Sequence, residues 1–132
     1  MKDNDQEKLP FVVAITGASG AIYGLRLLQY LLESGQPVDL LLSKAAQRVM
    51  KEEHDLELGN EVESKLLAYL KLPQAVPLKL HPLNDYGASV ASGSYRTRGM
   101  VVLPCSLGSL GALAAGLTEN LIHRAAAVTL KE

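Results

Sequence analysis

The sequence has no tryptophan, a single phenylalanine and a single cysteine, and its charges nearly cancel. Because Cys105 stands alone, no internal disulfide can form, which fits a protein of the reducing cytoplasm. No apolar run approaches the roughly 18 residues that a membrane-spanning helix needs. The net charge is −1, so no basic excess points to a nucleic acid. We therefore expect a cytoplasmic protein whose partners are neither membranes nor nucleic acids.

Length and apolar content indicate one globular domain. The chain has 132 residues, of which 48% are hydrophobic, and this is enough to build a buried core. The first residues are polar and charged, unlike a signal peptide, so residues 1–10 are expected to form a flexible tail. Residues 11–132 are expected to form the domain.

Short apolar runs alternate with helical patterns along this domain. Strands are expected at residues 11–16, 38–42, 78–81 and 100–103, and helices at residues 21–33, 44–53, 61–70, 107–115 and 119–130. Thr118 is the expected cap of the last helix. The alternation predicts an α/β fold with a doubly wound parallel sheet. Such a sheet should continue with another strand, so we expect the C-terminal part of the fold to be missing from this chain.

A glycine-rich turn follows the first expected strand. Gly17 and Gly20 allow a tight turn and a close approach of a ligand, and the helix behind them begins with unpaired N–H groups that attract an anion. The turn therefore indicates a nucleotide or flavin mononucleotide (FMN). With Gly24, the spacing differs from the G-x-G-x-x-G of dinucleotide sites, and Asp39 lies at the start of the second strand, away from a ribose. A tight turn without a ligand is the alternative.

A second turn of this kind follows the fourth expected strand. Residues 104–109 place two serine hydroxyl groups and a glycine at the start of a helix. If the first and fourth strands are neighbours where the strand order reverses, both turns face the same ligand. Taken alone, Ser106 could be an ordinary helix cap.

Five segments, in this order, resemble one protein family. They are Thr16–Gly24, Ser43–Ala46, Ala91–Ser94, Leu103–Ser106 and Asn120–Glu132. Together they are similar to the UbiX-type flavin prenyltransferases, formerly described as aromatic-acid or phenylacrylic acid decarboxylases, over residues 11–132. Each segment alone is a weak signal, whereas five in order are specific.

The resemblance implies a Rossmann-like, FMN-binding domain and an enzyme activity. Family members transfer a dimethylallyl group from dimethylallyl phosphate to reduced FMN without a metal ion. The product, prenylated FMN, passes to a UbiD-type decarboxylase. Members assemble as trimers that combine into dodecamers, so the resemblance also implies a homo-oligomer with active sites at subunit boundaries.

The resemblance further implies roles for individual residues. The residues implied to bind FMN are Gly17, Ala18, Ser19, Ser43, Ser106, Leu107, Gly108 and Ser109. Ser19 and Glu53 are implied to be catalytic, lying next to the reacting flavin. Arg124 and Lys131 are implied to face the prenyl phosphate across a subunit boundary.

These residue types fit the implied chemistry. Arg124 and Lys131 can stabilise a departing phosphate in place of a metal ion. The carboxylate of Glu53 can stabilise an allylic cation or move a proton. Without the resemblance, Glu53 belongs to a charged run typical of a solvated surface, and Arg124 and Lys131 are ordinary surface residues of one helix.

The histidines and the cysteine indicate no metal site. His54, His81 and His123 lack metal-ligand spacing with one another or with Cys105. Each histidine is expected at the surface or at a helix cap. Cys105 is expected to be a small buried residue and not a nucleophile.

The chain stops where family members continue. In the family, the next segment holds an apolar strand, a Val-Pro-Arg-Glu-type motif, and a tyrosine and a basic residue that bind the prenyl phosphate. We therefore expect these 132 residues alone to lack a complete substrate site. The alternatives are a non-catalytic FMN-binding or assembly module, or a related FMN-dependent cysteine decarboxylase. The cysteine decarboxylase is disfavoured because such enzymes typically use a catalytic histidine early in the chain, whereas no histidine precedes His54 here.

Overall fold

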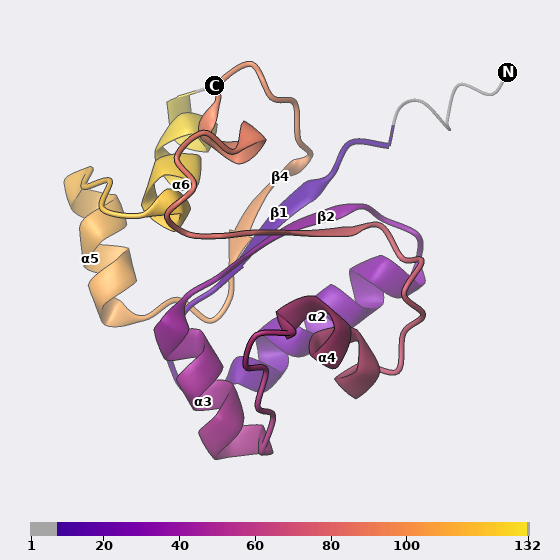
Figure 1. Ribbon diagram of the computed structural model, residues 1–132. Coiled ribbons are helices and arrows are strands. Elements are labelled where there is room, and N and C mark those ends of the chain that lie inside the picture. Colours follow the sequence, from indigo (N-terminus) through magenta and orange to yellow (C-terminus); the bar gives the residue numbers. More distant parts are fainter. Residues whose placement is uncertain (1–7, 132) are drawn as a thin grey trace, which may run out of the picture.

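The computed structural model describes residues 8–131 and confirms the α/β fold (Figure 1). The strands are β1 (Phe11–Ile15), β2 (Val38–Leu42), β3 (Leu78–His81) and β4 (Gly99–Val102). They form one parallel sheet in the order β3-β2-β1-β4. The chain passes from β1 outward to β2 and β3, and then returns to the other side of β1 with β4. The strand order therefore reverses between β1 and β4, and ligands of such folds bind outside the carboxyl ends of the strands at this point.

Helices cover both faces of the sheet. They are α2 (Ala21–Glu33), α3 (Lys44–His54), α4 (Val62–Tyr69), the short 3₁₀ helix η1 (Ser89–Ala91), α5 (Leu107–Ala115) and α6 (Leu121–Lys131). Figure 1 shows α2, α3 and α4 on one side of the strands and α5 and α6 on the other. The expected strands and helices are confirmed to within about two residues at their ends.

The cap expected for the last helix is wrong. α6 begins at Leu121, and its cap is Asn120, whose Oδ1 accepts the backbone N–H of His123 at 3.0 Å. In return, the His123 Nδ1 accepts the backbone N–H of Glu119 at 3.2 Å. Thr118 lies outside this reciprocal arrangement, which satisfies backbone donors at the helix start.

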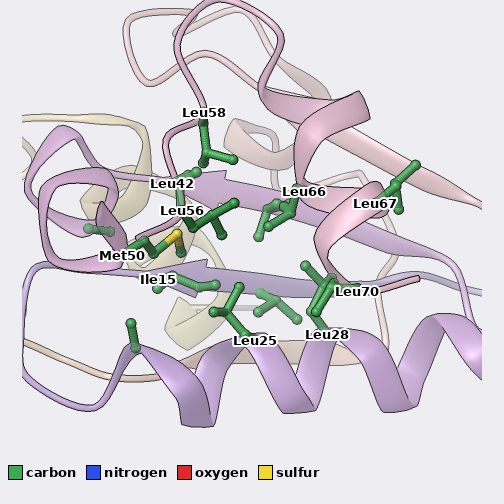
Figure 2. Close-up of a cluster of buried hydrophobic side chains, with 14 of the residues drawn as sticks. Ile15, Leu25, Leu28, Leu42, Met50, Leu56, Leu58, Leu66, Leu67 and Leu70 are labelled. Carbon is green, nitrogen blue, oxygen red and sulfur yellow. The ribbon is translucent and has the colours of Figure 1, made fainter. Parts of the chain in front are cut away.

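The larger hydrophobic core lies between the sheet and α2, α3 and α4. Figure 2 shows Ile15 and Leu42 of the sheet facing Leu25 of α2, Met50 of α3 and Leu66 of α4. Alternate residues of β1 and β2 point to this face because strand side chains alternate with a period of two. The opposite face, with Val12, Ala14 and Leu41, packs against η1 and α6 in a smaller core. Burial on both faces explains why β1 and β2 are apolar almost throughout.

The expected flexible tail at residues 1–10 lies mostly outside the described residues. Of its last residues, Leu9 accepts a hydrogen bond from the Gln36 side chain at 2.7 Å, and Pro10 accepts one from the Arg98 backbone at 2.8 Å. Among the helices of residues 8–131, none is long and apolar enough to span a membrane.

Candidate functional site

The two expected turns lie side by side, joined by one buried threonine. Thr16 follows β1, and its Oγ1 donates to the Pro104 carbonyl and accepts the Ser106 backbone N–H, each at 2.7 Å. The Thr16 backbone N–H also donates to the Pro104 carbonyl at 3.2 Å. Thr16 is only 2% exposed, so these bonds are shielded from water. The prediction that the turns after the first and fourth strands are neighbours is thereby confirmed.

Glycines let the surrounding elements pack closely on the first turn. A Cβ on Gly17 would overlap the Cβ of Ala45 at the start of α3, and a Cβ on Gly24 would overlap the Leu103 carbonyl. Gly20 has a left-handed backbone with φ of 95°, which favours glycine. Gly17 and Gly24 are thus required by contacts within the protein, whether or not a ligand is bound.

The structure brings together the two residues expected to be catalytic. Ser19 Oγ donates to Glu53 Oε2 at 2.9 Å, and the backbone N–H groups of Gly20 and Ala21 point to Glu53 Oε1 at 3.3 Å each. The hydrogen bond from Ser19, followed by those from the two backbone N–H groups, lowers the pKa of the Glu53 carboxyl below its ordinary 4.5. The group at the N-terminus of α2 is thus an anion of the protein itself, the carboxylate of Glu53, and a bound phosphate at this turn stays a prediction.

The second turn presents hydroxyl groups and open backbone. Ser106 caps α5: its Oγ accepts the Ser109 backbone N–H at 3.1 Å and donates to Ser109 Oγ at 3.0 Å. Nothing lies within 4 Å of the position that a Cβ would take on Gly108, and Leu107 is 87% exposed. Ser106 is therefore both a helix cap and part of an accessible turn at the switch point.

Ser43 lies on a cavity of about 660 Å³ at the carboxyl ends of β2 and β3. It caps α3 by accepting the Ala46 backbone N–H at 3.0 Å. The cavity is lined by Leu42, Ser43, Lys44, Gln47, Val62, Leu80, His81, Pro82, Leu83, Asn84 and Asn120. Of these residues, only Ser43 is among those that the resemblance implies to bind FMN. The polar side chains of His81 and Asn120, which also line the cavity, were missed.

His81 is buried, so its expected place at the surface or a helix cap is wrong. It is 5% exposed, and its Nε2 lies 2.8 Å from Oδ1 of Asp39, which is 2% exposed. The Tyr95 hydroxyl donates to the other oxygen of Asp39 at 2.7 Å. Burial, followed by the Asp39 carboxylate, raises the pKa of Tyr95 to about 12. Because both oxygens of Asp39 are engaged inside the protein, this residue cannot serve as the ribose-binding acid of a dinucleotide site.

The two basic residues expected at the prenyl phosphate lie on α6, away from these contacts. Arg124 and Lys131 are exposed and, seven residues apart on one helix, lie about 10 Å from each other along its axis. Within residues 8–131 neither forms a salt bridge, and no hydrogen bond joins their side chains to Ser19, Glu53 or Ser106. The described residues also contain no cluster of three or more His, Cys, Asp or Glu side chains suited to a metal ion.

Comparison with known proteins places this geometry in a family. The model of the family named Flavoprotein matches residues 1–132, the whole chain. The chain belongs to this family.

Within it, the resemblance to UbiX-type flavin prenyltransferases is confirmed by relatives that carry the name flavin prenyltransferase UbiX. The relative from Alkalihalophilus pseudofirmus is 48% identical over 120 residues, and the match covers 91% of this chain and 59% of the relative. The relative from Pseudomonas aeruginosa is 46% identical over 123 residues, with 91% and 58% covered. The chain therefore spans about 60% of the length of these relatives.

Solved structures agree with the fold. A crystal structure of AnUbiX in complex with FMN and dimethylallyl pyrophosphate has a TM-score of 0.81 and 37% identity, covering 96% of this chain and 61% of that one. A dodecameric FMN-dependent UbiX-like decarboxylase from Escherichia coli has a TM-score of 0.78 and 34% identity, with 94% and 61% covered. The cypemycin decarboxylase CypD, at 19% identity and a TM-score of 0.63, is similar in fold alone.

Proposed function

We propose that this chain is the FMN-binding part of a flavin prenyltransferase, which transfers a dimethylallyl group from dimethylallyl phosphate to reduced FMN. The observation that carries the proposal is the Ser19–Glu53 pair, held at the switch point beside the turn of Ser106. Relatives named flavin prenyltransferase UbiX, 36–48% identical to this chain, support the same activity.

The donors of the site fit FMN. The Ser106 turn offers hydroxyl groups and open backbone N–H groups, and Ser43 offers a hydroxyl group at the tip of β2. With Gly17, Ala18 and Ser19 they would hold the flavin, and Leu107, Gly108 and Ser109 would complete the second turn. The reduced flavin, when bound, supplies the electron-rich ring atom that accepts the prenyl group.

The chain's own residues serve charge stabilisation and proton transfer. Because its pKa is lowered, Glu53 is a carboxylate at neutral pH and can stabilise positive charge on the allylic carbon or accept a proton. Ser19 Oγ donates to that carboxylate and fixes its orientation. The exposed side chains of Arg124 and Lys131 are free to turn toward a phosphate and to stabilise its departure. We propose that a second subunit brings the substrate to them.

An exposed apolar helix supports assembly with further copies of the chain. On α5 and directly after it, Leu107, Leu110 and Leu117 are 87%, 55% and 48% exposed, which is unusual for neighbouring leucines of a monomer. A similar structure from Escherichia coli is dodecameric. We propose a trimer-based dodecamer in which α5 lies at a subunit contact. A UbiD-type decarboxylase as recipient of the product, and a cytoplasmic location, stay predictions.

The activity is tested with the full-length protein, reduced FMN and dimethylallyl phosphate under anaerobic conditions. Mass spectrometry of the extracted flavin should show a gain of one prenyl unit. Dimethylallyl pyrophosphate, which is bound in the AnUbiX structure, is tested in parallel to identify the preferred donor. Retention of flavin without any mass gain from either donor would instead support the non-catalytic FMN-binding module.

A further inference from the structure

The outer face of α2 carries two large aromatic side chains that the candidate site does not use. Tyr23 and Tyr30 are 66% and 68% exposed. On the opposite side of the same helix, Leu25, Leu28 and Leu32 are buried in the larger core. The helix is therefore well packed on its inner side and leaves two phenol rings in water on its outer side. Exposed aromatic residues close to one another are typical of a surface that binds a protein.

The outer face of α2 is also poor in charge. Of the thirteen residues of α2, only Arg26 and Glu33 are charged. The neighbouring helix α3 has eleven residues, and five of them are lysine, arginine or glutamate. The exposed side of a surface helix is ordinarily polar and charged, as it is on α3. Depletion of charge together with tyrosine and arginine is instead the composition found at the centres of protein interfaces.

The exposed residues of α2 form a stripe that reads nearly the same from either end. The helical period places Tyr23, Arg26, Leu27 and Tyr30 on one side, with the two tyrosines about 10 Å apart along the axis. The midpoint of the stripe lies between Arg26 and Leu27. A two-fold axis at this midpoint brings Tyr23 of one copy opposite Tyr30 of a second copy, and the same pair forms twice. The stripe is therefore self-complementary, as a two-fold contact between identical chains requires.

Arg26 at the centre of the stripe has no acidic partner in the described part of the chain. Its Nη1 donates to Gln29 Oε1 on the same helix at 2.8 Å, which holds the guanidinium against α2. Within residues 8–131 it forms no salt bridge. A guanidinium that is not paired with a carboxylate binds well to the face of an aromatic ring. A second copy of the stripe supplies two such rings.

The stripe lies on the other side of the sheet from the leucines of α5 (Figure 1). One contact can close three copies into a ring, but joining such rings into a larger assembly needs a second contact on a separate surface. A similar structure from Escherichia coli is dodecameric. The two exposed apolar surfaces, on α5 and on α2, match this need for two separate contacts.

We propose that α2 pairs with α2 of a second copy in an antiparallel two-fold contact made by Tyr23, Arg26 and Tyr30, and that this contact joins the trimers. The inference rests on the trimer-based dodecamer proposed above. The contact begins next to the candidate site. A Cβ on Gly20 would meet the ring of Tyr23 at 3.1 Å, and the backbone N–H of Gly20 points to the Glu53 carboxylate.

The first test measures the mass of the full-length protein and its variants by light scattering. Tyr23→Glu and Tyr30→Glu should each reduce twelve copies to three, about a fourfold loss of mass, because a carboxylate is buried in place of a ring. Tyr30→Phe should keep the dodecamer, since the ring makes the contact. Arg26→Glu should also give trimers. Its matched control is Arg48→Glu, which makes the same charge change at an exposed arginine of α3 and should leave the mass unchanged.

A cross-linking test does not depend on disrupting the contact. It uses the variant Cys105→Ser as background, because Cys105 is a free cysteine. Arg26→Cys should form a disulfide with its own counterpart on oxidation, since the two-fold axis leaves the two residues about 1.5 Å apart along the helix. Tyr23→Cys alone should not, because its two copies lie about 10 Å apart along the helix. Tyr23→Cys mixed with Tyr30→Cys should form the disulfide between unlike variants.

The possible results separate the inference from its alternatives. Dodecamers of Tyr23→Glu and Tyr30→Glu, monomers in place of trimers, or an unmodified protein no larger than a trimer would overturn it. A loss of stability at unchanged mass would show that another part of the same chain covers α2, and this too would overturn it. Prenyl transfer by a protein whose α2 variants all stay dodecameric refutes the inference alone. Dodecamers that split into trimers as expected, but do not transfer a prenyl group, refute the proposed function alone.

Discussion

Replacing Thr16 by valine should loosen the connection between the two turns. Valine keeps the shape and the β-branch of threonine, so the buried position after β1 stays filled. What is lost is the hydroxyl group that donates to the Pro104 carbonyl and accepts the Ser106 N–H. Thr16→Val therefore isolates the two hydrogen bonds from packing.

The size of the effect follows from which partners remain unsatisfied. The Ser106 N–H loses its acceptor, which costs about 1–3 kcal/mol for a buried donor and less where water reaches it. The Pro104 carbonyl keeps the Thr16 backbone N–H at 3.2 Å, so its loss is about 1 kcal/mol. Together we expect the free energy of unfolding to fall by about 2–4 kcal/mol.

Thr16→Ser is the matched control, because it keeps the hydroxyl group and removes only a methyl group, at a cost of about 1 kcal/mol. Urea denaturation of the full-length proteins should give a lower midpoint for Thr16→Val than for Thr16→Ser at an unchanged slope. FMN affinity should follow the same order. Equal midpoints would refute the reasoning that this hydroxyl holds the two turns together.

Three further predictions concern neighbouring parts of the fold. Gly24→Ala should lower stability by about 1–3 kcal/mol, because the added Cβ would overlap the Leu103 carbonyl. The control Gly111→Ala adds its Cβ in open space on α5, so it should stabilise the protein by about 0.5–1 kcal/mol and raise the melting temperature. Tyr95→Phe should lower stability at neutral pH by about 1.5–3 kcal/mol, since it removes a hydrogen bond to the Asp39 carboxylate. Because the pKa of Tyr95 is raised to about 12, the unmodified protein should lose this contribution as the pH rises from about 10 toward 12. Denaturation at several pH values checks this. Glu53→Gln should slow prenyl transfer by about 100-fold or more, while FMN binding, measured by flavin absorbance, should persist. Since the pKa of Glu53 is lowered, the contribution of its carboxylate to the stability of the unmodified protein should be present above about pH 4.5 and should fade only below that pH.

The strands and helices were predictable because local patterns determine them. β1 and β2 are buried on both faces and therefore read as continuous apolar runs, and glycines or serines mark the turns that follow. That the two turns lie next to each other was also predictable, because an α/β chain places successive strands by known topological rules. The cap of α6 was not, since Thr118 and Asn120 are both suitable residues and only the backbone path selects one.

The site was less predictable because its contacts join distant residues. Ser19 and Glu53 are 34 positions apart, and only the resemblance to a family suggested their association. The contact between Asp39 and His81 spans 42 positions, and nothing in the surrounding sequence marks either residue as buried. A buried acid paired with a histidine becomes visible only when β2 and β3 are placed side by side.

A crystal structure of the full-length protein with FMN tests the central claim most directly. We predict one flavin at the carboxyl ends of β1 and β4, in contact with the turn of Ser19 and with the turn of Ser106 at the same time. A flavin bound elsewhere, or in contact with only one of these turns, would contradict the account.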